Sequence, residues 1–154
     1  MMVQELLEVA LLAALPISEV RGALPYGVLV GKLPFFWVVV VSFIFNLLPF
    51  FLVMFALNFF LKLLLRWEWF SNFWSKYITR AQNQFKNYEK WGKWGIMLFV
   101  GIPLPLTGVW TGSIVCFVAG LSWKESLPFI LGGLAMATFL VSLAVLGGNY
   151  LLTG

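Results

Sequence analysis

The chain has 154 residues, of which 62% are hydrophobic and only 10% are charged. A soluble domain is usually about half apolar and about a quarter charged, so this composition indicates an integral membrane protein. The net charge of +4 is concentrated in one segment, which fits membrane orientation better than nucleic-acid binding. One cysteine and no histidine exclude an internal disulfide and the usual metal clusters. We therefore expect a single membrane domain with no metal, no cofactor and no nucleic-acid partner.

Two short apolar runs open the chain, on either side of a charged stretch. Residues 3–15 read VQELLEVALLAAL and stop at Pro16, and residues 23–31 read ALPYGVLVG. The continuous apolar part of the first run would form a helix about 15 Å long. A hydrocarbon core is roughly 30 Å thick, so neither run spans it alone. We expect a helical hairpin over about 3–31, with the tip PISEVRG near the middle of the membrane.

Residues 35–57 form the first stretch that is long enough to cross a bilayer. Pro49 lies inside it, lacks a backbone donor and predicts a kink one turn earlier, near Phe45. Asn46 lies in the same helix. It either hydrogen-bonds the broken tip or, as is more common for such an Asn, holds two helices together.

The next segment, residues 58–94, is basic and rich in aromatic residues at spacings of three and four. That pattern predicts an amphipathic helix at the membrane–water interface, more often a simple linker than a specific anionic-lipid site. The excess of bases places the linker in the cytoplasm and the protein in the cytoplasmic (inner) membrane. Its bases are Lys62, Arg66, Lys76, Arg80, Lys86, Lys90 and Lys93, against the acids Glu68 and Glu89.

The second half repeats this organisation. Residues 95–106 read GIMLFVGIPLPL and residues 107–120 read TGVWTGSIVCFVAG, again two short apolar runs around prolines. They predict a second hairpin over about 95–120. Residues 126–148 then form a second full span.

An offset of 89 residues aligns the two halves. Pro16 then meets Pro105, and Ser18 meets Thr107. A stripe at four-residue spacing also recurs, which places its members on one helical face where small side chains let helices approach closely. The stripe residues are Glu19, Ala23, Gly27 and Gly31 in the first half and Gly108, Gly112, Cys116 and Gly120 in the second. We interpret this as an internal duplication of the kind found in transporters.

Two topologies fit the repeat. If each short pair is a re-entrant hairpin, the halves are inverted, the first hairpin enters from outside and the second from the cytoplasm. If each pair is one broken spanning helix, the chain has four spans and both termini are cytoplasmic. The loop charges do not decide between the two.

Glu19 and Arg21 lie in the first tip, and a charge in the middle of a bilayer is costly enough to need a reason. The second tip is uncharged but offers donors from Thr107, Trp110 and Thr111. We expect the two tips to meet and share a polar site. Arg21 could bind an anionic group, which its planar guanidinium suits, and Glu19 could carry a proton. Alternatively, the two charges form a structural pair that fixes the tip.

The stretches LPISEVRGALPYG and PLPLTGVWTGSIVCFVAG together resemble the small multidrug export protein family of prokaryotic membrane proteins. That family is similar, more distantly, to the DedA superfamily. The resemblance implies two membrane-penetrating hairpins with inverted symmetry rather than four spans. It also implies movement of polyprenyl-phosphate carriers or phospholipids, with an acidic residue at Glu19 and, in the export family, an arginine at Arg21. DedA proteins carry an arginine in the second hairpin, where this chain has Trp110.

The leading hypothesis is therefore a transporter or lipid translocase that moves a small amphipathic or anionic substrate, with proton coupling through Glu19. A passive lipid scramblase and a structural subunit of a membrane complex are the alternatives. An enzyme is the least expected class, because the chain lacks histidine, paired acids and a phosphate-binding loop. We expect membrane lipid as a partner and a homodimer as the assembly, since so few helices enclose little space.

Overall fold

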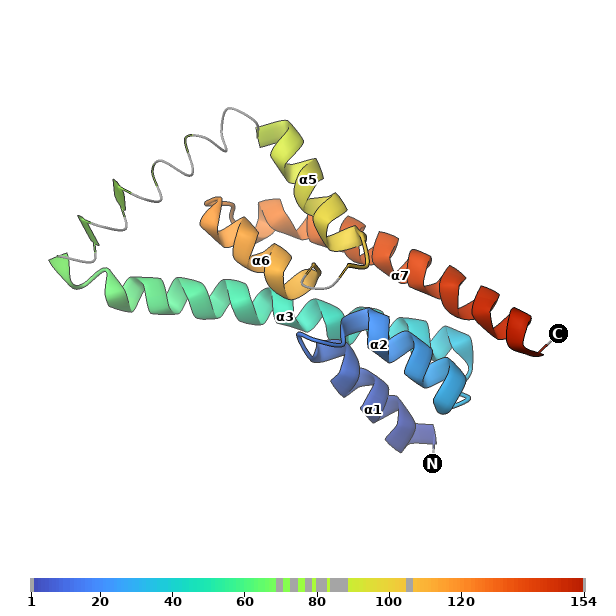
Figure 1. The fold of residues 1–154 in the computed structure, drawn as a ribbon. Helices are drawn as coiled ribbons and strands as arrows, with labels where there is room; N and C mark the ends of the chain where they lie inside the picture. The colour runs from blue at the N-terminus through green and yellow to red at the C-terminus, as the bar shows by residue number, and fades with distance from the viewer. Residues whose placement is uncertain are drawn as a thin grey trace.

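The computed structural model describes residues 2–68, 71–72, 75–76, 79, 83, 89–104 and 107–153. This part of the chain is helical and contains no strand, so the predicted all-α class is confirmed. The elements, shown in Figure 1, are α1 (Met2–Ala14), α2 (Glu19–Pro25), the π-helix η1 (Tyr26–Val30), α3 (Phe35–Leu64), α5 (Glu89–Gly101), α6 (Val109–Val118) and α7 (Trp123–Thr153).

Two of the described helices are long and apolar enough to cross a membrane, as predicted. Phe35–Leu64 has a mean hydropathy of 2.6 and Trp123–Gly148 one of 2.4. They run in opposite directions in Figure 1. The first continues to Leu64, beyond the predicted end at residue 57. Lys62 therefore belongs to the helix rather than to the linker. A lysine is tolerated at this position because its long stem can lie along an apolar helix while its amine reaches water.

The first pair of short helices folds back on itself beside α3. The Tyr26 hydroxyl donates a hydrogen bond to the Glu8 carboxylate, so α2–η1 runs antiparallel to α1. Gly27 lies between α1 and α3, where an added Cβ would come within 2.9 Å of Val9 and 2.6 Å of Val38. The turn at residues 15–18 lies beside Asn46, near the middle of α3. The hairpin therefore reaches only about half the length of the long helix.

The second pair packs on α7 in a similar way. Met97 of α5 lies against Gly132 and Met136 of α7 lies against Gly101, so the two helices run in the same direction. The chain then turns, and α6 packs with Gly112 against Val100 of α5. α6 also lies beside α3 in Figure 1, which joins the two halves of the molecule.

The helix bounds repeat with the offset found in the sequence. Adding 89 to the bounds of α1, α2–η1 and α3 gives 91–103, 108–119 and 124–153. These values lie within two residues of the bounds of α5, α6 and α7. Most of the linker, including its predicted aromatic face, lies outside the described residues, so the amphipathic interfacial helix stays a prediction.

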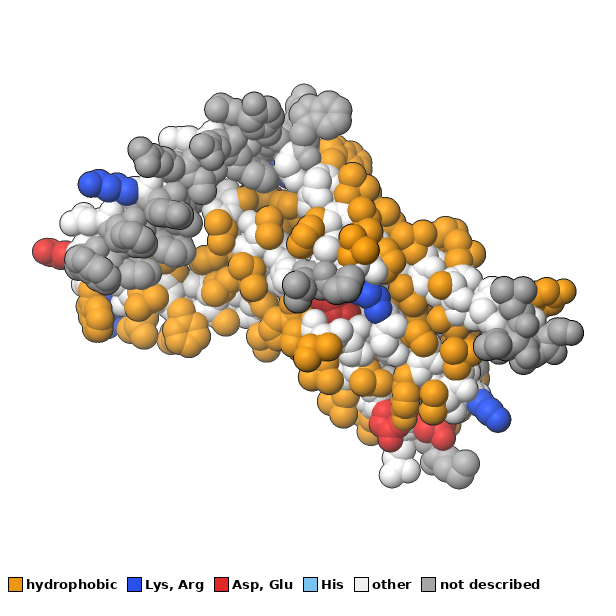
Figure 2. Space-filling view, viewed as in Figure 1, with side chains coloured by type: hydrophobic (Ala, Val, Ile, Leu, Met, Phe, Trp, Pro, Cys, Tyr) orange, Lys and Arg blue, Asp and Glu red, His pale blue; other side chains and the backbone are white. Residues whose placement is uncertain are grey.

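The outer surface is largely apolar. Figure 2 shows hydrophobic side chains over most of the visible face, with charged groups near its ends and one adjacent acidic and basic pair near its centre. Large side chains such as Phe36, Phe55 and Phe139 are 60% or more exposed. A surface of this kind suits contact with lipid rather than with water.

Candidate functional site

Glu19 is the first residue of α2 and is almost completely buried, with 4% of its surface exposed. Its backbone has φ = +49°, a left-handed conformation that is uncommon and strained for a residue with a side chain. The chain adopts it where α1 has ended and α2 begins. This turn directs the carboxylate away from its own hairpin and toward the second one.

The Glu19 carboxylate lies at the N-terminus of α6. The Trp110 backbone N–H donates a hydrogen bond of 3.4 Å to Oε1. The residue before α6 is Gly108, which has no side chain to cap the helix, so the carboxylate of Glu19 supplies a cap from the other hairpin. The negative charge also lies at the positive end of the helix dipole, which stabilises it.

Gly108 makes this approach possible. A Cβ on this residue would lie 2.6 Å from Cδ and Oε1 of Glu19, and closer still to Oε2. Its φ of +140° is also one that residues with side chains rarely adopt. The two residues that the offset of 89 pairs, Glu19 and Gly108, are therefore in direct contact.

Arg21 joins the same two tips. Its guanidinium lies 3.2 Å from Oε2 of Glu19 and donates hydrogen bonds to the backbone carbonyls of Leu104 and Thr107. Those carbonyls flank the turn of the second tip. The side chain is 24% exposed, so it is held by the protein on one side and remains open on the other.

A further bond runs between the tips through Trp110. Its indole N–H donates a 3.0 Å hydrogen bond to the Ala14 carbonyl, at the end of α1. Thr107 stabilises its own turn, because its hydroxyl donates to the carbonyls of Ile102 and Leu104 at 2.7 and 2.8 Å. The structure thus brings Glu19, Arg21, Thr107 and Trp110 together.

Asn46 supports the first tip from α3. With its amide oriented to satisfy the groups around it, the nitrogen donates to the Ala13 carbonyl at 3.3 Å and the oxygen accepts from the Val20 N–H at 3.2 Å. The residue is 1% exposed. It therefore satisfies backbone groups at the break and joins three helices at once, which combines the two roles considered for it.

The other predicted tip residues contribute less. Pro16 lies exposed in the turn, and the Ser18 side chain makes no capping hydrogen bond. The Thr111 hydroxyl bonds at 3.4 Å to the Gly108 carbonyl of its own helix start rather than to the charged pair. Pro105 lies outside the described residues.

The small-residue stripes are used only in part. Gly27 and Gly112 are packing contacts, and Ala23 and Cys116 are fully buried. Gly31 instead ends η1, where an added Cβ would meet groups of its own turn. Gly120 lies beyond the end of α6, is exposed and has φ = +76°, so it terminates the helix rather than packing against another.

A cavity of about 420 Å³ lies beside Arg21. Apart from Arg21, its described walls are apolar: Pro25, Leu29, Pro103, Leu140, Val141, Ala144, Val145 and Gly148. Among the described lining residues, the guanidinium is the one charged group, and the rest of the wall is apolar. Such a space suits an amphipathic molecule with an anionic group.

Residues 19–140, more than half of the chain, match the family described as "Putative small multi-drug export protein". The chain belongs to this family. The matched region begins at Glu19 in the first tip, includes the second tip and α3, and ends inside α7, so the family match and the membrane-spanning helices agree on a membrane protein. No curated protein and no solved structure matches the chain, and the more distant DedA similarity is not shown.

The sequence did not indicate the backbone partners of the site. The carbonyls of Ala14, Leu104 and Thr107 take part through the main chain, so no residue type marks them. The offset of 89 was the one available signal, since it pairs the charged tip with residues 105–110. Among the described residues, no group of three or more metal-ligating side chains is close enough to hold a metal.

Proposed function

We propose that this family member is a membrane transporter for a small amphipathic substrate with an anionic group, and that the two tips are its binding site. The observation that carries the proposal is the position of Arg21. It is paired with a buried carboxylate, bridges two backbone carbonyls and still lines an apolar cavity. This favours transport over enzymatic chemistry, because no cysteine, histidine or second acid accompanies the pair among the described residues.

In the closed arrangement, Glu19 acts as the resident anion of the site. Its carboxylate pairs with the guanidinium of Arg21 and accepts a hydrogen bond at the N-terminus of α6. These are the two groups that would bind a substrate anion. A substrate can take these positions once Glu19 is protonated and no longer competes. Proton binding and anion binding then favour each other, which is the basis for proton-coupled transport in this proposal.

We further propose that the short helix pairs are re-entrant hairpins and that the halves are inverted repeats. The antiparallel long helices, the half-length hairpins and the repeated helix bounds support this. A cysteine introduced at Glu5 tests it, because the sole native cysteine, Cys116, is fully buried and is shielded from reagents. Labelling by an impermeant reagent from outside is expected, and labelling only from the cytoplasm would support four broken spans instead.

The transport proposal is tested with purified protein in liposomes. The probe is 8-anilinonaphthalene-1-sulfonate, an amphipathic anion whose fluorescence reports its movement, with and without an imposed pH gradient. Glu19→Gln and Arg21→Ala should each abolish uptake, whereas the matched controls Glu5→Gln and Arg66→Ala should retain it. Thermal unfolding of each variant shows that lost uptake is not lost folding.

Different results would point to the other candidate functions. Equal uptake in the folded tip variants and the controls would overturn the assignment of the site. Movement of a labelled phospholipid without any gradient would indicate a passive scramblase. No movement of either probe by the folded wild-type chain would favour a structural subunit that acts through contacts with a second copy or with partner helices.

A further inference from the structure

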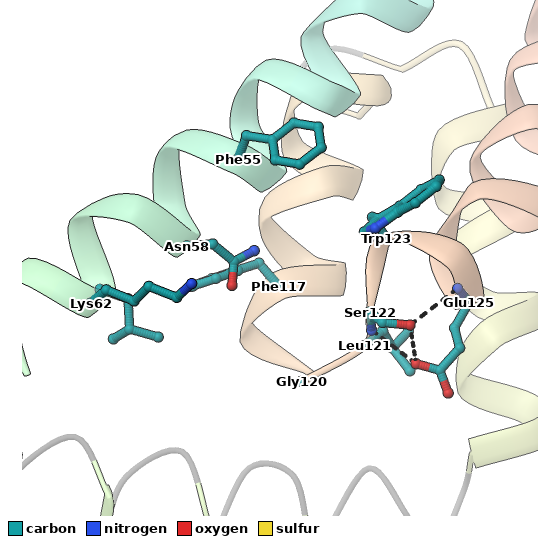
Figure 3. A pocket seen from close by; sticks show the side chains of 10 residues that line it. Phe55, Asn58, Lys62, Phe117, Gly120, Leu121, Ser122, Trp123 and Glu125 are labelled. Atoms are coloured by element: carbon teal, nitrogen blue, oxygen red, sulfur yellow. Dashed lines mark hydrogen bonds between the residues drawn. The ribbon is translucent and has the colours of Figure 1, made fainter.

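A second cavity, of about 520 Å³, lies at the other end of the molecule from η1 and the start of α3. It is enclosed by the last turns of α3, the end of α6 and the start of α7, as Figure 3 shows. Ligand sites usually have volumes of about 300–1,000 Å³, so this space is large enough for part of a small molecule. It shares no lining residue with the tip site.

Along this cavity, the side chains on one face of α3 change from apolar to polar to charged. Phe55, Asn58 and Lys62 follow at spacings of three and four, so they lie on the same face. The Asn58 amide donates to the Met54 carbonyl, which leaves its oxygen as an acceptor. Lys62 lies in the last turn of the span, and its amine extends toward α6 in Figure 3. No carboxylate of the described residues forms an ion pair with it.

The opposite wall adds aromatic surface and an occupied carboxylate. Phe117 and Trp123 line it from α6 and α7. Glu125 lies there too, but its Oε2 accepts hydrogen bonds from the Ser122 N–H at 2.9 Å and the Ser122 hydroxyl at 2.6 Å. This reciprocal cap is completed by the Glu125 N–H, 3.4 Å from the Ser122 hydroxyl oxygen. Lys93 also acts on this carboxylate electrostatically. Glu125 keeps its negative charge on this wall, but among the described residues it is held by its own cap and forms no ion pair with Lys62.

The level of the cavity in the membrane points to the kind of ligand. Lys62 is close to the end of one candidate span and Trp123 is the first residue of the other. Span ends lie near the headgroup level, where tryptophan and lysine are typically found. A molecule in this cavity would meet aromatic carbon toward the membrane interior and, toward water, the Lys62 amine on one wall and the capped Glu125 carboxylate on the other.

We propose that this cavity holds a resident anionic phospholipid, with its phosphate on Lys62, its ester region at Asn58 and the upper part of its acyl chains against Phe55, Phe117 and Trp123. A charge-assisted contact to Lys62 supplies the preference for a phosphate, and the aromatic wall supplies the preference for a lipid over a soluble ion. The lipid is bound by the transporter rather than carried by it. The proposal does not rest on the assignment of the tips.

The test is native mass spectrometry of the full chain in detergent, with phosphatidylglycerol and phosphatidylethanolamine added at equal concentration. One phosphatidylglycerol should be retained in preference to phosphatidylethanolamine. Lys62→Gln should reduce its retention about tenfold or more, and Lys62→Arg should restore it. Lys124→Gln is the matched control, because Lys124 belongs to the same end of the molecule but stacks over the Trp123 ring, 5.6 Å from its centroid, and does not line the cavity.

Two further variants and a competitor sharpen the result. Glu125→Gln should leave retention unchanged or raised, because glutamine also completes this type of cap. Glu19→Gln should not alter it, which separates this site from the tips. Equal losses in the Lys62 and Lys124 variants would overturn the proposal in favour of general surface charge. Displacement of the lipid by inorganic phosphate at the same concentration would also overturn it, since the site would then recognise a free anion.

Discussion

Replacing Gly108 with alanine should break the contact between the two tips. The new Cβ would lie 2.6 Å from Cδ of Glu19, and the carboxylate cannot retreat without leaving the Trp110 N–H or Arg21. The φ of +140° adds strain of about 1–3 kcal/mol. Separating a fully buried ion pair typically costs about 3–5 kcal/mol, and this pair should cost less because Arg21 is 24% exposed. Because relaxation is shared between the two effects, we expect a total loss of about 3–5 kcal/mol in the free energy of unfolding.

A double-mutant cycle with Glu19→Ala isolates the contact from the strain. Without the carboxylate, only the strained backbone conformation opposes an alanine at position 108. The loss in the free energy of unfolding caused by Gly108→Ala should then fall to about 1–3 kcal/mol. Gly95→Ala is the matched control, since Gly95 is exposed in α5 and an added Cβ meets nothing within 4 Å. That change should be neutral or stabilise by up to about 1 kcal/mol.

Denaturant titration in detergent, followed by circular dichroism, measures the four corners of the cycle. The reasoning predicts a coupling energy of about 2 kcal/mol between positions 19 and 108. Additive losses would refute the direct contact. A Gly108→Ala protein as stable as the Gly95→Ala control would refute both the contact and the strain.

Three other substitutions probe the same region by unfolding midpoint. Arg21→Lys should lose about 1–3 kcal/mol, because a lysine amine cannot bridge both carbonyls of the second tip; an equal loss in Arg66→Lys would contradict this. Asn46→Leu keeps the volume but leaves a buried carbonyl and N–H unpaired, which should cost about 2–3 kcal/mol, and no loss would show that these bonds are not formed. Gly112→Ala should cost about 1–3 kcal/mol through overlap with Val100, and Val100→Ala in the same chain should recover most of it unless the two positions are independent.

Much of the architecture could be predicted because the membrane imposes lengths. Runs of about ten apolar residues cannot cross a hydrocarbon core, and runs of more than twenty can, so the short and long helices were separable by counting. Helix ends were harder to place. α3 extends to Leu64 and so includes Lys62, which we had assigned to the basic linker. A lysine with its flexible stem occurs both at the end of a spanning helix and in an interfacial segment, so its presence does not distinguish the two.

The candidate site was predictable only as a pair of tips. Glu19 and Arg21 stood out because charges are rare in apolar sequence, and the offset of 89 indicated what they face. The carbonyl partners of Arg21 could not be found, since every residue carries a carbonyl and only the turn decides which ones point inward. Gly31 and Gly120 continued the four-residue spacing beyond the last helical turn, where periodicity no longer reports packing.

The groups that pair with the Glu19 carboxylate limit which ligands can replace it. Arg21 is held by two carbonyls and one carboxylate, and the start of α6 is held by the same carboxylate. A neutral or cationic ligand that displaced Glu19 would leave a partly buried arginine and a helix N-terminus without an anion, which is costly. An anionic ligand would keep both the Arg21 guanidinium and the N-terminus of α6 paired with an anion. The displaced Glu19 carboxylate would then be unpaired, and protonation would remove its charge. Under the proposed function, the sign of the substrate charge is therefore linked to proton binding, and a substrate that is moved without regard to its charge would require a different site.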